Sequence, residues 1–400
     1  MKKTLITLLG TGKYQNGGYE KTTYCFNNGK EFTTSLFLNA ILDNDPSITD
    51  VFIIGTSTTG WDVLCEQDEA AWLKVKDECE GESGLQPDSH ELITNVLKDR
   101  YPMVNFAIKV HTHALGRDTA GEVFNTYVDT VREAADSCQR LVVDITHGFR
   151  SMPLLLWQAL QLESDSLDDI SILYGEYIKP EKVSRVRDLS AYWRFSEIAK
   201  AQQAFLKRLD GFAIADFIEH DWPEGAKAIR KLSGIVLANF ALQVPGTLRQ
   251  IANALESIQQ NVPAWVAATH AQLNKFHNRL ASMGSEHVIV LEYAKVLAEC
   301  KLYTQAVIAQ QVAVEMFVAG DQYGDYDWWQ SNGRAWLKEM KKQLSRQHNE
   351  ALSRLEELRN QIAHGGYNNK YGGQGFPNFE NIEPTMRRTF PAIEALFTVT

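Results

Sequence analysis

The stretch Arg140–Ser151, with the sequence RLVVDITHGFRS, combines a buried strand, a polar turn and the beginning of a helix. Its apolar run Leu141–Ile145 is short and contains β-branched residues, which is typical of a strand. An apolar helix is expected over Met152–Glu163, with Ser151 as its N-cap and Pro153 in its first turn. A strand that leads directly into a helix is a unit of a parallel α/β sheet.

The whole first half of the chain repeats this unit. Further strands are predicted by short apolar runs at Thr4–Leu9, Asp50–Gly55, Val104–Val110 and Ile170–Tyr174. Helical periodicity predicts helices at Phe32–Leu42, Glu66–Glu80, Ser89–Lys98 and Glu122–Ala135. The alternation predicts a mostly parallel, Rossmann-like sheet with helices on both faces.

Three polar loops are expected at the carboxyl ends of these strands, where ligands of open α/β sheets bind. They consist of glycines, hydroxyls and a few cations, which suit a phosphate or a cyclic oligonucleotide held by main-chain amides. The candidate ligand-binding residues are Gly10, Thr11, Gly12 and Lys13 in the first loop, Thr56, Ser57 and Thr58 in the second, and Thr146, His147, Gly148, Phe149 and Arg150 in the third.

Each loop also has a purely structural interpretation. The hydroxyls of the second loop could simply form a turn. In the third loop, His147 could be a capping or packed histidine, and Arg150 could pair with Asp144 or Asp118. For these two residues the sequence leaves both a structural role and direct ligand contact open.

The strand patterns end at about residue 188, and the rest of the chain is predicted to be all α. Helical periodicity covers Ser190–Asp210, Asp216–Glu219, Glu224–Ala241, Thr247–Gln259, Ala264–Met283, Val288–Leu297, Thr304–Val318 and Trp336–Ala363. A break is expected at Met283–Ser285. We therefore expect three domains, with residues 1–188 forming the α/β domain, 189–285 a helical connecting region and 286–400 a C-terminal helical domain.

The last of these helices ends in the sequence ELRNQIAHGG, Glu357–Gly366, which holds a candidate active site. His364 is predicted in the last turn, where the negative end of the helix dipole favours its protonated form, and Asn360 lies one turn before it. The guanidinium of Arg359 can offer two hydrogen bonds to a phosphate. These groups suit cleavage of a phosphodiester. The alternative is that Arg359 pairs with Glu356 and His364 caps the helix carbonyls.

Two motifs resemble those of known families. The run from Arg359 to His364, Arg-Asn-x-x-Ala-His, resembles the Arg-x4-6-His signature of HEPN ribonucleases. The run Asp144–Pro153, Asp-x-Thr-His-Gly-Phe-Arg-Ser-x-Pro, resembles a hallmark of CARF domains in CRISPR-associated proteins. Together the motifs make the chain similar to type III CRISPR ancillary ribonucleases of the CARF-HEPN kind, with residues 1–188 as the CARF-like domain and 286–400 as the HEPN-like domain.

The resemblance implies a function and roles for the three candidate catalytic residues. The chain would be a metal-independent endoribonuclease that cleaves single-stranded RNA in antiviral defence, leaving 2′,3′-cyclic phosphate and 5′-hydroxyl ends. Arg359 would stabilise the charge of the transition state, His364 would act as general acid or base, and Asn360 would orient the phosphate or the imidazole. Glu315, on the neighbouring helix, could orient Arg359 or could lie on the surface.

The resemblance also implies partners. A cyclic oligoadenylate, with cyclic tetra-adenylate as the expected ring, would bind the CARF loops across the axis of a homodimer and activate the enzyme without any other cofactor. A CARF-type transcriptional regulator remains an alternative, because a helix-turn-helix could lie within Glu224–Ile258. A non-catalytic HEPN-like interaction protein is the other alternative.

Composition and charge narrow these possibilities. The formal net charge of −10 disfavours broad binding of duplex nucleic acid, although a local cluster of Lys338, Lys341, Lys342, Arg346 and Arg354 precedes the Arg359 motif. The usual meaning of such a run is a solvated helix face. The five cysteines are scattered without a Cys-x-x-Cys pair, so neither a disulfide framework nor a metal site is expected. No stretch has the length of a membrane span, and a cytoplasmic protein is expected.

Overall fold

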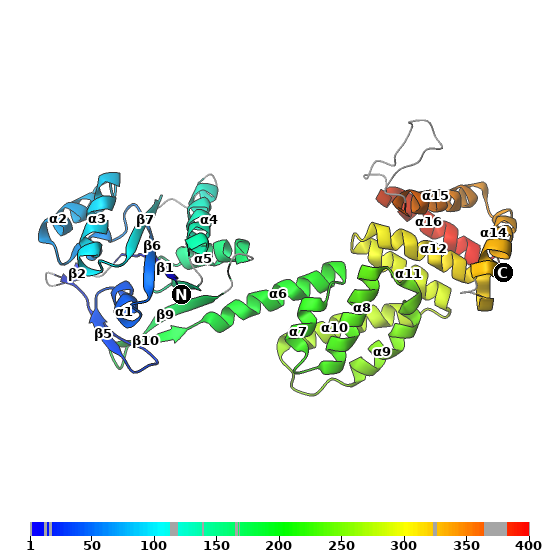
Figure 1. The fold of residues 1–400 in the computed structure, drawn as a ribbon, viewed down its shortest axis with the longest axis horizontal. Helices are drawn as coiled ribbons and strands as arrows, with labels where there is room; N and C mark the ends of the chain where they lie inside the picture. Colours follow the sequence, from blue (N-terminus) through cyan, green and yellow to red (C-terminus); the bar gives the residue numbers. More distant parts are fainter. Residues whose placement is uncertain are drawn as a thin grey trace. The chain divides into compact units, whose positions relative to one another are not determined.

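The computed structural model describes residues 2–11, 14–15, 18–112, 119–137, 140–164, 167, 169–322, 326–363 and 382–399. The chain divides into two compact units, Met1–Ser196 and Glu197–Thr400, and each is described by itself (Figure 1). Five residues named above, Gly12, Lys13, Asp118, His364 and Gly366, lie outside the described residues.

The first unit is built around an eight-stranded sheet. Its central part consists of five parallel strands in the order β9-β8-β1-β6-β7. These strands are β1 (Lys3–Leu8), β6 (Ile48–Thr56), β7 (Asn105–His111), β8 (Arg140–Asp144) and β9 (Ile170–Ile178). The mostly parallel sheet and all five strands predicted from apolar runs are therefore confirmed.

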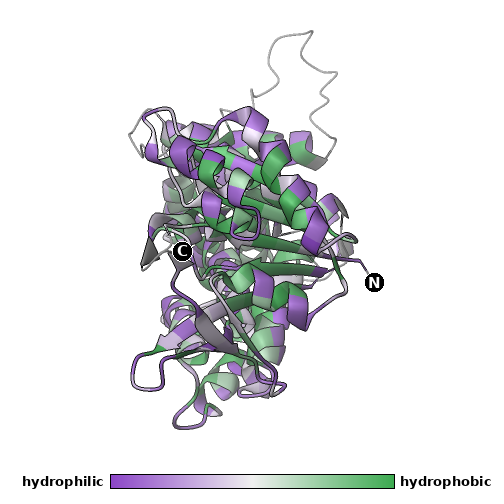
Figure 2. Cartoon of the chain, turned by 90° about the vertical axis from the view of Figure 1, so that its left-hand side faces the viewer, coloured by the Kyte–Doolittle hydropathy of each residue, from purple (hydrophilic) through white to green (hydrophobic). Residues whose placement is uncertain are grey.

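Helices cover both faces of this sheet, because alternate strand residues enter two different cores. Leu5 and Ile53 pack in one core with α1 (Phe37–Asn44), η1 (Trp61–Cys65), α2 (Glu69–Glu80) and α3 (Pro87–Arg100). Ile6 and Ile54 pack in the other with α4 (Ala120–Ser137) and α5 (Ser151–Leu162). Figure 2 shows the central strands coloured mainly as hydrophobic and the helices with faces of both kinds.

Three strands that the sequence did not predict extend the sheet beyond β9. They are β10 (Val183–Asp188), antiparallel to β9, then β4 (Thr22–Cys25), parallel to β10, and β5 (Glu31–Thr34), antiparallel to β4. A separate hairpin joins β2 (Tyr14–Gln15) to β3 (Gly18–Tyr19).

Two predicted helix starts were wrong in this unit. The helix predicted from Phe32 begins only at Phe37, because residues 31–34 are taken up by β5, whose threonines pair with β4. Ser151 is not the cap of α5 but its first helical residue, and the preceding Arg150 makes no capping hydrogen bond.

The second unit is all α, as predicted. Its helical elements are α6 (Ser190–Arg208, which starts in the first unit), α7 (Phe212–Ile218), α8 (Pro223–Ala238), η3 (Ala241–Gln243), α9 (Val244–Glu256), α10 (Ala264–Ala281), α11 (Glu286–Glu299), α12 (Tyr303–Ala319), η4 (Gly320–Gln322), α13 (Tyr326–Trp328), η5 (Trp329–Gly333), α14 (Arg334–Lys341), α15 (Arg346–Ala363) and α16 (Ile382–Phe397). No described helix is both long enough and apolar enough to cross a membrane.

One hydrophobic core runs through this unit from Ile198 to Leu396. Contacts therefore do not separate residues 197–285 from residues 286–400, although we expected a boundary there. The single helix predicted over Trp336–Ala363 was wrong, because α14 ends at Lys341 and α15 begins at Arg346. The last helix, α16, was not predicted.

Helix α12 holds α15 and α16 in place. Gln310 of α12 is fully buried, donates a hydrogen bond to the Met386 carbonyl (3.3 Å) and accepts one from Thr389 Oγ1 (2.8 Å) of α16. Leu355 and Leu358 of α15 are buried in the same core. Because these leucines face inward, Arg359 and Asn360 lie on the more accessible side of α15.

Candidate functional site

The first candidate site lies where the strand order reverses. From β1 the chain continues to β6 and β7 on one side, and it returns to β8 and β9 on the other side. The loops after β1 and β8 therefore leave a crevice between them at the carboxyl ends of the strands. A cavity of about 680 Å³ lies there, and four predicted residues line it, namely Gly10, Thr11, Thr146 and His147.

A buried carboxylate holds the turn that follows β8. Asp144 is completely buried, and it accepts hydrogen bonds from Thr7 Oγ1 (2.6 Å) and from the backbone N–H of Thr146 (2.8 Å). Burial raises the pKa of Asp144. Thr146 Oγ1 in turn accepts a hydrogen bond from the backbone N–H of Gly175 (2.9 Å) on β9. Asp144 is thus engaged by β1 and by its own turn, while Arg150 is exposed.

His147 caps a helix from within the cavity wall. Its Nε2 accepts a hydrogen bond from the backbone N–H of Phe37 (3.2 Å), the first residue of α1, and lies 2.9 Å from the Tyr24 hydroxyl. Because an amide can only donate, His147 is neutral with its proton on Nδ1. Burial lowers the pKa of His147, against the opposing charge of Asp144. Within the protein, His147 therefore has the capping role that was one of its two interpretations.

This cap predicts a pH-dependent stability. Because folding lowers the pKa of His147, the unfolded chain takes up a proton first, near pH 6.5, and the free energy of unfolding falls as the pH drops below that value. The variant His147→Gln keeps an acceptor for the Phe37 amide but cannot titrate. We expect the stability of wild type to fall more steeply than that of the variant between about pH 7 and pH 5.

The measurement is urea unfolding of both proteins at several pH values. The raised pKa of Asp144 acts in the opposite direction, since it favours the folded state as the pH falls, but this carboxyl is present in both proteins. The difference between the two curves therefore reports the histidine together with its charge interaction with Asp144. If the stability of wild type and of His147→Gln depends on pH in the same way, His147 is not a neutral helix cap.

The second predicted loop forms a turn and does not line the cavity. The backbone N–H of Thr56 donates to Thr59 Oγ1 (2.6 Å), and Trp61 Nε1 donates to the Thr56 carbonyl (2.8 Å). The Ser57 carbonyl accepts from the backbone N–H of Leu85 (2.8 Å), and Thr58 is exposed. This loop follows β6, on the far side of β1 from the crevice.

The rest of the third loop turns away from the cavity as well. A Cβ on Gly148 would lie 2.9 Å from Leu8, so this glycine packs against β1. Phe149 packs against the core beneath α4 and α5. Neither residue, nor Arg150, is among the described residues that line the cavity.

Sequence reasoning missed further residues that line the cavity, some from the unpredicted strand β4 and some from the end of β9. Thr22 and Tyr24 lie on β4, Tyr174 and Tyr177 on β9, and Lys179 just after β9. Tyr177 is 52% exposed, and Thr22 Oγ1 is buried without a hydrogen-bond partner in the described structure. Tyr174 and Tyr177 before Lys179 were a visible signal, whereas Thr22 and Tyr24 reach the crevice only because β4 pairs with β10.

The second candidate site surrounds Arg359 and Asn360. Both residues line a groove of about 660 Å³ between α14 and α15, together with four further cations, which are Arg334, Lys338, Lys341 and Lys342. Glu356 is the one carboxylate among the described lining residues, and it pairs with Lys341 (Nζ to Oε1, 2.9 Å) rather than with Arg359. Within the described part of the chain, the guanidinium of Arg359 forms no hydrogen bond or ion pair.

Glu315 of α12 lies close to this groove without an ion pair to Arg359. It is half-buried and accepts a hydrogen bond from Gln311 Nε2 (2.9 Å). Burial raises the pKa of Glu315, while the positive charges of Arg359 and Arg334 act to lower it. Glu315 is thus neither a surface residue nor a direct partner of Arg359.

The basic cluster predicted before Arg359 divides into two parts. Lys338, Lys341 and Lys342 face the groove. Arg346 pairs with Glu350 (2.9 Å), and Arg354 lines a separate hollow on α15. Only part of this run is therefore a solvated helix face.

Comparisons with known proteins agree with this architecture. Residues 4–180 match the family described as "CRISPR system endoribonuclease Csx1, CARF domain". CRISPR-associated protein MJ1674 of Methanocaldococcus jannaschii is 22% identical over 334 residues, which cover 76% of this chain and 52% of the relative. The chain thus spans about half the length of this curated relative.

A solved structure of Enterococcus italicus Csm6 bound to cyclic hexa-2′-fluoro-hexa-dAMP aligns with 99% of this chain and 94% of that chain, with a TM-score of 0.39 and 10% identity.

The parallel sheet with its crevice between β1 and β8, and the family match over the same residues, define the first unit as a CARF domain. Residues 4–180 are thus similar to the CARF domain of a CRISPR-associated protein family, and the curated relative is also a CRISPR-associated protein.

Proposed function

We propose that this protein is a cytoplasmic, metal-independent endoribonuclease that cleaves single-stranded RNA when a cyclic oligoadenylate binds its CARF domain. One observation carries the proposal. Arg359 and Asn360 share a groove with four further cations, in a chain whose formal net charge is −10. An acidic protein that gathers five cations around one carboxylate has a local site suited to a polyanion.

The groups at this site match the needs of RNA cleavage. RNA carries its own nucleophile, the ribose 2′-hydroxyl, so the enzyme has to align it with the phosphate, move protons and stabilise charge. Arg359, which is not engaged by a described carboxylate, would bind the phosphate and stabilise the transition state. His364 would transfer the proton, and Asn360 would orient the phosphate or the imidazole. The products would be a 2′,3′-cyclic phosphate and a 5′-hydroxyl.

The cavity of the CARF domain supports a cyclic oligoadenylate as the activator. Thr11 and Lys179 can bind phosphates, and the exposed rings of Tyr174 and Tyr177 can stack on adenine bases. In this proposal two copies of the chain form a homodimer, the ring lies across the two-fold axis, and each groove supplies half of one composite catalytic site. Cyclic tetra-adenylate is the expected ring.

The decisive experiment incubates the full chain with a labelled single-stranded RNA in EDTA, without activator or with cyclic tetra-adenylate or cyclic hexa-adenylate. We expect cleavage that depends on one of the rings, with 2′,3′-cyclic phosphate ends identified by mass spectrometry. If neither ring stimulates cleavage, the proposal that this protein is an endoribonuclease is refuted. Ring-dependent binding of duplex DNA would then indicate a regulator, and binding of neither nucleic acid would indicate an interaction protein.

Replacing Lys338 with alanine tests the groove separately from catalysis. Lys338 lines the groove, and it has no ion-pair partner among the described residues. Loss of one phosphate contact should weaken RNA binding several-fold and reduce the slope of log affinity against log salt by about 0.7. Fluorescence anisotropy over a series of salt concentrations measures both quantities. Lys227→Ala, at an exposed lysine on α8, is the control and should change neither.

A further inference from the structure

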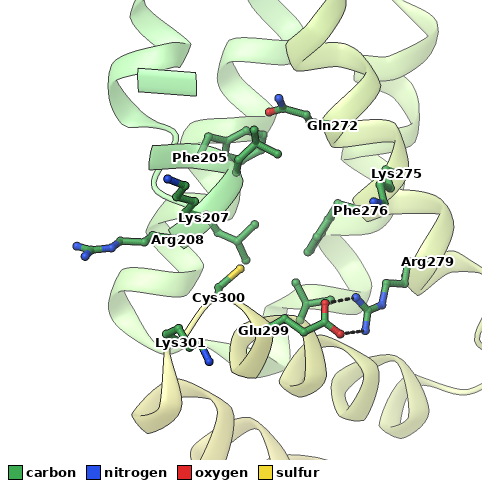
Figure 3. A pocket seen from close by; sticks show the side chains of 13 residues that line it. Phe205, Lys207, Arg208, Gln272, Lys275, Phe276, Arg279, Glu299, Cys300 and Lys301 are labelled. Carbon is green, nitrogen blue, oxygen red and sulfur yellow. Dashed lines mark hydrogen bonds and ion pairs between the residues drawn. The ribbon is translucent and has the colours of Figure 1, made fainter. Parts of the chain in front are cut away.

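A third cavity lies within the second unit, and its lining residues belong to neither site described above. It has a volume of about 570 Å³ and is enclosed by the end of α6, by α10 and by the end of α11 (Figure 3). This volume lies in the range of about 300–1,000 Å³ that is typical of small-molecule sites. The chemistry of its walls indicates what kind of molecule it fits.

The floor of the cavity is apolar and aromatic. Phe205 of α6 and Phe276 of α10 face the cavity from different helices (Figure 3), and Leu209 and Val296 complete the floor. All four side chains are buried in the core of the unit. Two phenyl rings beside an open space suit a planar, apolar group better than they suit a solvated side chain.

The mouth of the cavity is cationic. Lys207, Arg208 and Lys275 line it, are exposed, and form no ion pair with a carboxylate in the described structure. Glu299 is the one carboxylate among the lining residues, and Arg279 neutralises it with two hydrogen bonds of 2.6 and 2.8 Å. Lys301 also lines the cavity and pairs with Glu383 (3.3 Å), so Lys207, Arg208 and Lys275 are the cations that favour a ligand with an anionic group outside the apolar floor.

An unsatisfied amide separates two classes of such ligands. Gln272 of α10 lines the cavity, and its Oε1 is buried without a hydrogen-bond partner in the described structure. A buried carbonyl oxygen of this kind requires a donor. Each of the four nucleobases carries an N–H donor, whereas the alkyl chain of a fatty acid carries none.

We propose that this cavity binds a free nucleotide. The base lies against Phe205 and Phe276 and donates a hydrogen bond to Gln272 Oε1, and the phosphates lie among Lys207, Arg208 and Lys275 at the mouth. This binding activity goes beyond RNA cleavage and beyond activator binding, because it uses a different part of the fold.

The test is calorimetric titration of the full chain with ATP, adenosine and dodecanoate. We expect ATP to bind more tightly than adenosine, with a difference that shrinks at high salt. Lys275→Glu, which reverses an exposed charge at the mouth, should weaken ATP binding by about tenfold. Lys227→Glu makes the same exchange at an exposed site away from the cavity and should leave the ATP affinity unchanged.

The amide contact has its own test. Wild type should prefer ATP to N6,N6-dimethyl-ATP, which lacks the exocyclic donor, by about tenfold, and Gln272→Leu should lose this preference. Thermal unfolding confirms that each variant is folded. Equal ATP affinity in wild type and Lys275→Glu, or binding of dodecanoate in place of ATP, would overturn the proposal. Binding of cyclic tetra-adenylate and cleavage of RNA are measured in the same variants and should be unchanged. A failure of the nucleotide-binding proposal can therefore be told apart from a failure of the proposed ribonuclease function.

Discussion

Replacement of Arg359 by alanine is expected to lower the rate of ring-stimulated RNA cleavage by about 100-fold or more. Loss of a single charge-stabilising donor at a reacting phosphate or oxyanion has an effect of this order. Arg359 is suited to this role because its guanidinium lines the basic groove and is not committed to a described carboxylate. Single-turnover cleavage with saturating cyclic tetra-adenylate measures the chemical step.

A matched control lies on the same helix. Arg354→Ala removes an exposed arginine of α15 that lines a different hollow, and its cleavage rate should stay within about twofold of wild type. His364→Ala should reduce cleavage as strongly as Arg359→Ala, and the double variant should be little worse than either, because residues that act as one unit are not additive. If the variant that lacks Arg359 cleaves RNA at the wild-type rate, this groove is not the active site.

Replacement of Gly10 by alanine is expected to destabilise the CARF domain by about 1–3 kcal/mol or more. A Cβ at this position would lie only 1.8 Å from the carbonyl oxygen of His147, which is a backbone atom and cannot rotate away. The loop after β1 would have to separate from the turn after β8. Because both line the cavity in which we propose that the activator binds, the affinity for cyclic tetra-adenylate should fall as well.

Urea unfolding and calorimetric titration with cyclic tetra-adenylate measure the two effects. Gly121→Ala is the control, since Gly121 lies in the first turn of α4 with no atom within 4 Å of an added Cβ. That exchange should be neutral or slightly stabilising, because alanine is the better helix former. Wild-type stability in Gly10→Ala would contradict the close approach of these two loops.

Part of the CARF cavity could be predicted from the sequence. The residues directly after β1 and β8 follow long apolar runs, so their place at the carboxyl ends of parallel strands could be inferred, and Gly10, Thr11, Thr146 and His147 do line the cavity. The loop after β6 looked equally suitable. It lies apart because the strand order, set by long-range pairing, puts β6 on the other side of β1.

The edge of the sheet beyond β9, in contrast, could not be predicted from the sequence. Strands β4 and β5 have four residues each, and their polar, β-branched composition does not distinguish them from a loop. β4 forms a strand because it pairs with β10, and β5 because it pairs with β4. Thr22 and Tyr24, which line the cavity from β4, were therefore beyond local sequence patterns.

The basic groove combines both kinds of information. The spacing from Arg359 to His364 and the lysines of Lys338–Lys342 are local features that the sequence displays. The helix break between Lys341 and Arg346 is not, and it is this break that lets α14 fold beside α15. Without it, Lys338 and Arg359 would lie 21 positions apart on one straight helix, about 30 Å from each other.

The sequence by itself determined the change from α/β to all-α structure near residue 188, the parallel core of the sheet and the CARF motif after β8. These features depend on periodicity and on contiguous residues, which act over a few positions along the chain. The tertiary structure alone decided which loops meet at the crevice, which cations share a groove with Arg359, and that His147 caps α1. These outcomes depend on contacts between residues far apart in sequence, such as Phe37 with His147, and packing of the whole unit selects them.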